Sequence, residues 1–156
     1  MAASAAWNPS YIVSDAEFSA SGTMTEAQIQ DFLFSKNSYL TYYNETRDSK
    51  IGPDNDVSVK GWRASRIIYQ CAQWYGLNPE VILATLQKEQ SLVTTTTLNQ
   101  YGIDWAMGYA VPDSGDRDYT KQGFSMQVDW GTWQLSWNKD KANTECAKVS
   151  PYCTGN

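Results

Sequence analysis

Apolar residues recur every three or four positions in several stretches of the chain, which is the spacing of one face of an α-helix. The clearest stretch begins at Asn78, a good helix-capping residue, and Pro79, which suits the first helical position. The apolar face that follows consists of Ile82, Leu83, Leu86 and Val93. Read in this way, the chain predicts helices over residues 26–35, 60–75, 79–92 and 125–139.

Two of these helices carry further boundary signals. Thr25 is followed three residues later by Gln28, which is the capping-box pattern of a helix start. Gly76 stands where a helix-ending glycine belongs, after the second apolar stretch. Gly131 falls inside the last stretch and predicts an irregular helix there. Strand signals are poor throughout, so the fold class that we expect is mainly α.

The predicted helices belong to one domain, because 156 residues are about the length of one domain. We expect residues 1–24 to form an extended N-terminal arm and residues 25–143 to form the domain. Residues 144–156 read as a C-terminal loop. Residues 37–57 read as a long loop, and residues 98–123 as an irregular region lining a cleft.

The composition argues against several classes of function. The net charge is −5, so binding to nucleic acid is not expected. The chain contains no histidine, which excludes Ser-His-Asp and Cys-His catalysis and the zinc sites that need histidine. Any hydrolase here must therefore move protons with carboxyl groups. No stretch is long and apolar enough to cross a membrane, no signal-peptide pattern is present, and no cofactor is indicated.

The sequence does not decide which of the three cysteines form a disulfide. Cys146 and Cys153 flank a short segment and are predicted to form a disulfide, which would fit an oxidising compartment. Cys71 lies in a helical pattern and is predicted to be a buried free thiol. Pairing between any other two of the three is the alternative. An acidic cluster in the 98–123 region is interpreted as a solvated loop and not as a metal site; it consists of Asp113, Asp116 and Asp118.

Glu89 is the strongest candidate for chemistry. It lies three residues after Leu86 and seven after Ile82, so it shares the apolar face of its helix. Burial on that face and the negative end of the helix dipole would both favour a protonated carboxyl group. A protonated carboxyl near neutral pH is what a glycosidase general acid requires. The alternative is a boundary residue whose carboxylate reaches solvent.

Aromatic residues are numerous, with seven Trp and ten Tyr. Trp130, Trp133 and Trp137 follow one another at helical spacing and form one stripe. Such rings stack on sugars when they are exposed, and they fill a core when they are buried.

The segment from Asn78 to Leu92 resembles the helix that carries the catalytic Glu in lysozyme-like soluble lytic transglycosylases. Residues 131–134, Gly-Thr-Trp-Gln, resemble the Gly-x-x-Gln segment that follows that helix in the same family. Three further segments, residues 86–90, 106–113 and 123–127, are similar to a group of secreted bacterial proteins with lysozyme-like domains. The resemblance covers about half of the chain, and the Ser that follows the Glu is displaced by one residue.

The resemblance implies a lysozyme-like fold around a central catalytic-Glu helix. It also implies a secreted, monomeric enzyme that cleaves the β-1,4 glycan of bacterial peptidoglycan, as a muramidase or a lytic transglycosylase, with Glu89 as general acid. Asp113 is the candidate for a second carboxylate and Asp104 the runner-up, although lytic transglycosylases manage with one Glu. The candidate substrate-binding residues are Gln90, Ser91, Tyr109, Gln127, Trp133 and Gln134.

Two other functions remain open at this stage. The first is a non-catalytic glycan-binding or adhesin module on the same fold, which would bind wall material and leave the glycan intact. The second is a structural envelope protein that has lost the chemistry, and an exposed Glu89 facing no cleft would favour it.

Overall fold

The computed structural model describes the backbone of residues 12–149 and the side chains of residues 12–142. The fold is mainly α, as predicted. Four helices carry most of it: α2 (Glu26–Ser35), α3 (Ala64–Tyr75), α4 (Pro79–Gln90) and α6 (Phe124–Val149). Shorter elements connect them: α1 (Asp15–Phe18), η1 (Tyr39–Thr41), β1 (Lys50–Ile51), β2 (Val57–Ser58), α5 (Gln100–Asp104) and η2 (Tyr119–Lys121).

Helix boundaries follow the predicted signals closely. Thr25 and Gln28 form the expected reciprocal capping box at the start of α2. Asn78 caps α4 by accepting a hydrogen bond from the Glu80 N–H group at 2.9 Å, and Pro79 opens the helix. Gly76 ends α3 in the left-handed conformation, with a φ of 60°.

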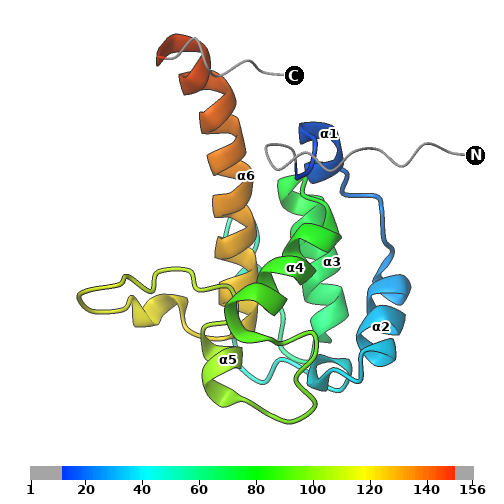
Figure 1. Ribbon diagram of the computed structural model, residues 1–156. Coiled ribbons are helices and arrows are strands. Elements are labelled where there is room, and N and C mark those ends of the chain that lie inside the picture. The colour runs from blue at the N-terminus through cyan, green and yellow to red at the C-terminus, as the bar shows by residue number, and fades with distance from the viewer. Residues whose placement is uncertain (1–11, 150–156) are drawn as a thin grey trace, which may run out of the picture.

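Helix α3 is the centre of the fold, because α2, α4 and α6 all pack against it. The prediction of a central 79–92 helix is therefore wrong, since α4 packs on one side of α3 (Figure 1). The apolar residues of these helices form one continuous core, which supports a single domain. The C-terminal part of α6 extends beyond the other helices (Figure 1).

Several elements differ from the sequence-based boundaries. The N-terminal arm contains α1, and the predicted loop over residues 37–57 contains η1 and β1. Strand β1 pairs with β2 in an antiparallel hairpin that packs against α6. Helix α6 runs to Val149, past the predicted end near residue 139 and into the stretch predicted to be a loop. In the part of the chain that the structure describes, no helix is both long enough and apolar enough to cross a bilayer.

Gly131 allows a close approach between α6 and the segment that contains Met107. A Cβ atom at position 131 would lie 2.9 Å from both Cβ and Sδ of Met107, which is itself buried. We expect Gly131→Ala to lower the free energy of unfolding by about 1–2 kcal/mol, because overpacking outweighs the gain in helix propensity. Gly22→Ala is the control, since a Cβ there would meet nothing within 4 Å. A denaturation curve of Gly131→Ala at or above wild-type stability would contradict this packing argument.

The cysteines divide between described and undescribed parts of the chain. Cys71 is buried in α3 and forms no disulfide, as predicted. The predicted Cys146–Cys153 bond lies outside the residues whose side chains the structure describes. It remains a prediction: titration of the denatured, unreduced protein should find one free thiol, and a count of three would refute the bond.

Candidate functional site

Glu89 lies in the last turn of α4, and its carboxyl group is open to solvent. Its side chain is 33% exposed, so the predicted burial on the apolar face is wrong. Ile82 and Leu86, on the same face of α4 as Glu89, are buried. The last turn of the helix, which carries Glu89, lies against the 105–108 segment instead. One carboxylate oxygen, Oε1, lies 3.2 Å from the Lys88 ammonium group. Exposed pairs of this kind contribute about 0–1 kcal/mol, so the pair is easily exchanged for another partner.

The second carboxylate oxygen of Glu89 is positioned against Gly108. A Cβ atom at position 108 would lie only 3.0 Å from Oε2, and Gly108 has a φ of 67°. Glycine therefore satisfies two needs at this position, the left-handed backbone and the room for the carboxylate. The residue that follows, Tyr109, begins the aromatic surface described below.

Gln127, in the first turns of α6, holds the segment that contains Gly108. It is fully buried, and its amide oxygen accepts hydrogen bonds from the N–H groups of Met107 (3.3 Å) and Tyr109 (3.0 Å). Its amide nitrogen donates to the carbonyl groups of Tyr109 (2.9 Å) and Lys121 (2.8 Å). Both the oxygen and the nitrogen of the Gln127 amide are therefore occupied by backbone groups of the protein. The prediction that Gln127 contacts substrate does not fit this arrangement. We therefore assign Gln127 a positioning role.

A continuous aromatic strip runs along α6 from this point. We use that name for the rings of Tyr109, Trp130, Trp133 and Trp137. Successive ring centroids lie 5.9, 5.6 and 6.2 Å apart. Trp133 is 36% exposed and Trp137 is 44% exposed. Two residues of the predicted Trp stripe, Trp133 and Trp137, are therefore exposed at the surface. Exposed rings of this kind can stack on sugars.

Charged groups meet the strip at its less exposed end, at Tyr109 and Trp130. The Lys121 ammonium nitrogen lies 3.9 Å from the centroid of the Trp130 ring, a cation–π contact. Partial burial raises the pKa of the Tyr109 hydroxyl, and Asp118 adds to the rise. Tyr109 is therefore a neutral hydrogen-bonding group at neutral pH.

The remaining predicted substrate contacts lie at the surface or near it. The amide of Gln90 donates to the Trp105 carbonyl group at 3.3 Å. Ser91 is exposed and ends α4 in the left-handed conformation. Gln134, one turn from Trp130 on α6, donates to Asn138 at 2.7 Å. No described bond joins these three to Glu89, and their contacts with substrate remain predictions.

Neither candidate for a second carboxylate is joined to Glu89 by a described contact. Asp113 is exposed in the loop of residues 108–118, which projects away from the helices (Figure 1). Asp104 is held by Arg47 at 3.1 Å and by the amides of Gln100 (3.0 Å) and Gln122 (2.9 Å). Its oxygens are thus committed to neighbouring side chains, whereas the role of Asp113 remains a prediction.

Sequence reasoning missed three residues that shape this site. Gly108 lies in the 106–113 segment that carries the resemblance, but no role could be assigned to it without its spatial neighbours. Lys121 is identified only by its spatial neighbours. Asp129, on α6 next to Trp130, is a buried carboxyl group that the periodicity alone could have flagged as an acid between apolar neighbours. Its partners come from residues more than 50 positions away, so spacing gives no sign of them.

Comparison with known proteins places the chain in a family. Residues 11–143 match the family model described as the N-terminal domain of LasA. Among curated proteins and among solved structures, nothing matches the chain significantly. Because the family match covers most of the 156 residues, this chain belongs to the LasA N-terminal domain family.

Proposed function

We propose that this domain is a lysozyme-like, secreted glycosidase that cleaves the β-1,4 glycan of bacterial peptidoglycan, with Glu89 as the general acid. The observation that carries the proposal is the position of the Glu89 carboxyl group, which is exposed at the end of α4 beside the segment that begins the aromatic strip. A general acid must reach the glycosidic oxygen, so an accessible carboxyl group is required.

The exposure of Glu89 means that the free protein does not shield its carboxyl group from water. In the free protein, solvent and Lys88 surround the carboxyl group. A glycan lying along the aromatic strip would exclude water from it, and desolvation favours the neutral form of a carboxyl group. We therefore propose that the bound substrate shields the Glu89 carboxyl group from water. The sequence alone instead predicts that the protein itself buries this group.

A mechanism with a single carboxyl group fits the described contacts better than a pair. Asp104 is occupied by other side chains, and Asp113 lies in the projecting loop. The resemblance to lytic transglycosylases implies that the acetamido group of the substrate assists the reaction in that case. Both hydrolysis and transglycosylation remain within the proposal.

Glycan binding without cleavage is the second candidate function. The exposed rings of the aromatic strip favour it, because rings can stack on sugars without cleaving them. The two functions differ in one experiment. The purified domain is incubated with insoluble peptidoglycan, and both the bound protein and the soluble fragments are measured. Release of fragments over time supports the glycosidase, whereas bound protein without fragments would establish the binding module and overturn the enzyme.

Gly108→Ala tests whether the contact between Gly108 and Glu89 matters for the proposed reaction. We expect activity to fall at least about tenfold, because the new Cβ atom displaces the carboxyl group. Gly76→Ala is the matched control: its φ of 60° is similar, and a Cβ there would meet nothing within 4 Å. Both variants should lose similar stability, about 1 kcal/mol. Equal rates of lysis by the two variants would argue against Glu89 as the acid.

A further inference from the structure

A cavity of about 280 Å³ lies between the β1–β2 turn, α3 and α6. Gly52, Pro53 and Asn55 form its wall on the hairpin side, and Tyr75 closes it from α3. Asp129, Trp130 and Trp133 line it from α6. Glu89 is not among its lining residues, but Trp130 and Trp133 also belong to the aromatic strip.

Among the described residues, Asp129 is the one charged residue that lines this cavity, and it is 2% exposed. Its described hydrogen bonds all end on one oxygen, Oδ1. That atom accepts from the Tyr75 hydroxyl at 2.8 Å, the Gly52 N–H group at 3.1 Å and the Cys71 thiol at 3.9 Å. Among the described residues, no donor reaches the other oxygen, Oδ2. Asp129 lines the cavity, so Oδ2 is free to accept a hydrogen bond from a group that enters it.

The surroundings of Asp129 include the kinds of group that recognise a cation. Two indole rings and a phenol ring line the cavity with the carboxyl group and the Asn55 side chain. The Trp130 indole N–H group is buried and has no acceptor among the described residues. Aromatic rings around one acidic group are the usual setting for recognition of an ammonium group. The Trp130 ring already contacts one ammonium group, that of Lys121.

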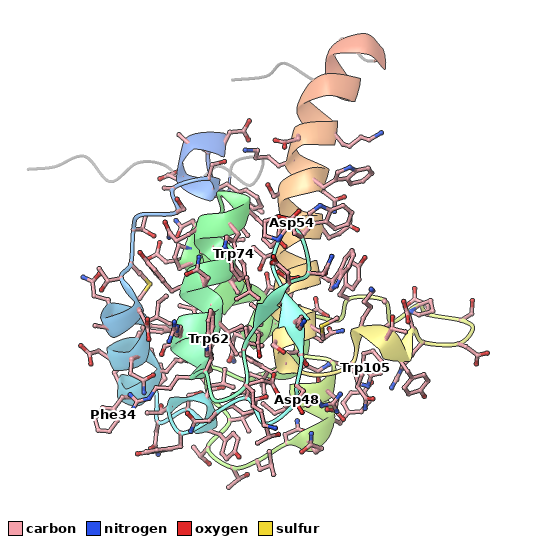
Figure 2. All side chains as sticks on the ribbon, turned by 180° about the vertical axis from the view of Figure 1, so that it is seen from behind. Phe34, Asp48, Asp54, Trp62, Trp74 and Trp105 are labelled. Carbon is pink, nitrogen blue, oxygen red and sulfur yellow. The ribbon has the colours of Figure 1, made fainter. Side chains whose placement is uncertain are left out.

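The rim of the cavity adds negative charge. Asp54 lies at the tip of the β1–β2 hairpin, beside α6 (Figure 2), between the lining residues Pro53 and Asn55. The whole chain carries a net charge of −5. Both features attract a cationic group to this face of the molecule.

We propose that this cavity binds an alkylammonium group of a ligand, such as the side chain of a lysine-like residue, with Asp129 Oδ2 as the acceptor. The volume lies near the lower limit of about 300 Å³ for ligand pockets, which suits a single group of side-chain size. Binding of the ammonium group needs no cleavage of a glycan, although the cavity shares Trp130 and Trp133 with the aromatic strip. Where the proposed function also holds, the cavity would favour wall material whose peptides carry free amino groups.

The test compares two probes that differ only in the charge. Nα-acetyl-lysine amide carries the ammonium group, and Nα,Nε-diacetyl-lysine amide does not. Each is titrated into the full chain and followed by the NMR signals of the backbone and indole N–H groups. We expect the charged probe to shift the Gly52 and Trp133 signals, with an affinity at least about tenfold above that of the diacetylated probe. Equal binding of the two probes, or binding of neither, would overturn the proposal.

Variants separate the cavity from general electrostatic attraction. Asp129→Asn should weaken binding of the charged probe at least about tenfold. Trp133→Leu and Trp137→Leu form a matched pair, because both replace exposed Trp residues and both variants are expected to fold. Of the two residues, Trp133 lines the cavity and Trp137 does not. Trp133→Leu should weaken binding several-fold and Trp137→Leu should leave it unchanged. A folded Asp129→Asn protein with wild-type affinity, or equal behaviour of the two Trp variants, would refute the site.

Discussion

Replacing Glu89 with Gln should lower the rate of peptidoglycan lysis by about 10²-fold or more. Gln keeps the size and polarity of the side chain but cannot donate a proton as a carboxylic acid does. The free energy of unfolding should change by no more than about 0.5 kcal/mol, because Glu89 is exposed and its ion pair with Lys88 is at the surface. Lysis rates and denaturation curves of the two proteins provide the measurement.

Glu80→Gln is the matched control on the same helix. Glu80 is exposed in the first turn of α4, at the opposite end from Glu89. Its replacement should leave the lysis rate nearly unchanged. Pull-down on insoluble peptidoglycan should give similar bound fractions for both variants, since the aromatic strip is intact. Full activity in Glu89→Gln would remove Glu89 from the mechanism.

Replacing Glu45 with Ala should lower the free energy of unfolding by about 3 kcal/mol or more. Glu45 is buried in the loop before β1, where its carboxylate accepts from the N–H groups of Arg47 (3.0 Å) and Ser125 (3.2 Å). The Tyr43 hydroxyl is a third donor, and burial together with Glu45 raises the pKa of that hydroxyl. Alanine would leave three donors without an acceptor. Because Ser125 lies in the first turn of α6, the start of that helix depends on this carboxylate.

Asp48→Asn provides the comparison for Glu45, since it changes an acid in the same loop. The Asp48 side chain is highly exposed and pairs with Lys60 at the surface. Its replacement should change stability by less than about 1 kcal/mol. Urea denaturation of both variants measures the difference. Equal stability of Glu45→Ala and Asp48→Asn would show that the buried carboxylate does not hold the loop to α6.

The helices that could be predicted are those with both periodicity and boundary signals. Helices α2 and α4 have a capping residue at the start, and their observed bounds agree with the prediction. Helix α1 carries the same kind of signal, because Ser14 and Glu17 form a capping box, but it is one turn long and has no apolar repeat. The β1–β2 hairpin has two residues in each strand, too few for an alternating pattern.

The environment of Glu89 could not be predicted from its helix alone. Spacing placed it correctly on the face of Ile82 and Leu86, but burial depends on what lies opposite each turn. Opposite the last turn lies Gly108, which leaves the carboxyl group open. The order of neighbours around α3 is likewise a property of the tertiary packing, which no local pattern specifies.

The surface position of the aromatic strip is a second feature that periodicity leaves undecided. Trp130, Trp133 and Trp137 share a face of α6 whether that face is buried or exposed. The structure exposes the latter two, although Ser136 between them donates a hydrogen bond to the Tyr75 carbonyl group of α3 at 2.8 Å. Exposure therefore depends on the side of α6 on which each residue lies. Gln127 shows the opposite case, since a polar residue predicted to contact substrate is instead fully buried and holds a loop.

Mass spectrometry of the fragments that wild-type protein and Glu89→Gln release from purified peptidoglycan tests the central claim most directly. We expect wild-type fragments to carry new sugar ends, either a reducing end from hydrolysis or an anhydro end from transglycosylation. The same fragments should be almost absent with Glu89→Gln. Intact glycan strands, or fragments whose new ends come from cleaved peptide bonds, would contradict the assignment of Glu89 as the acid of a glycosidase.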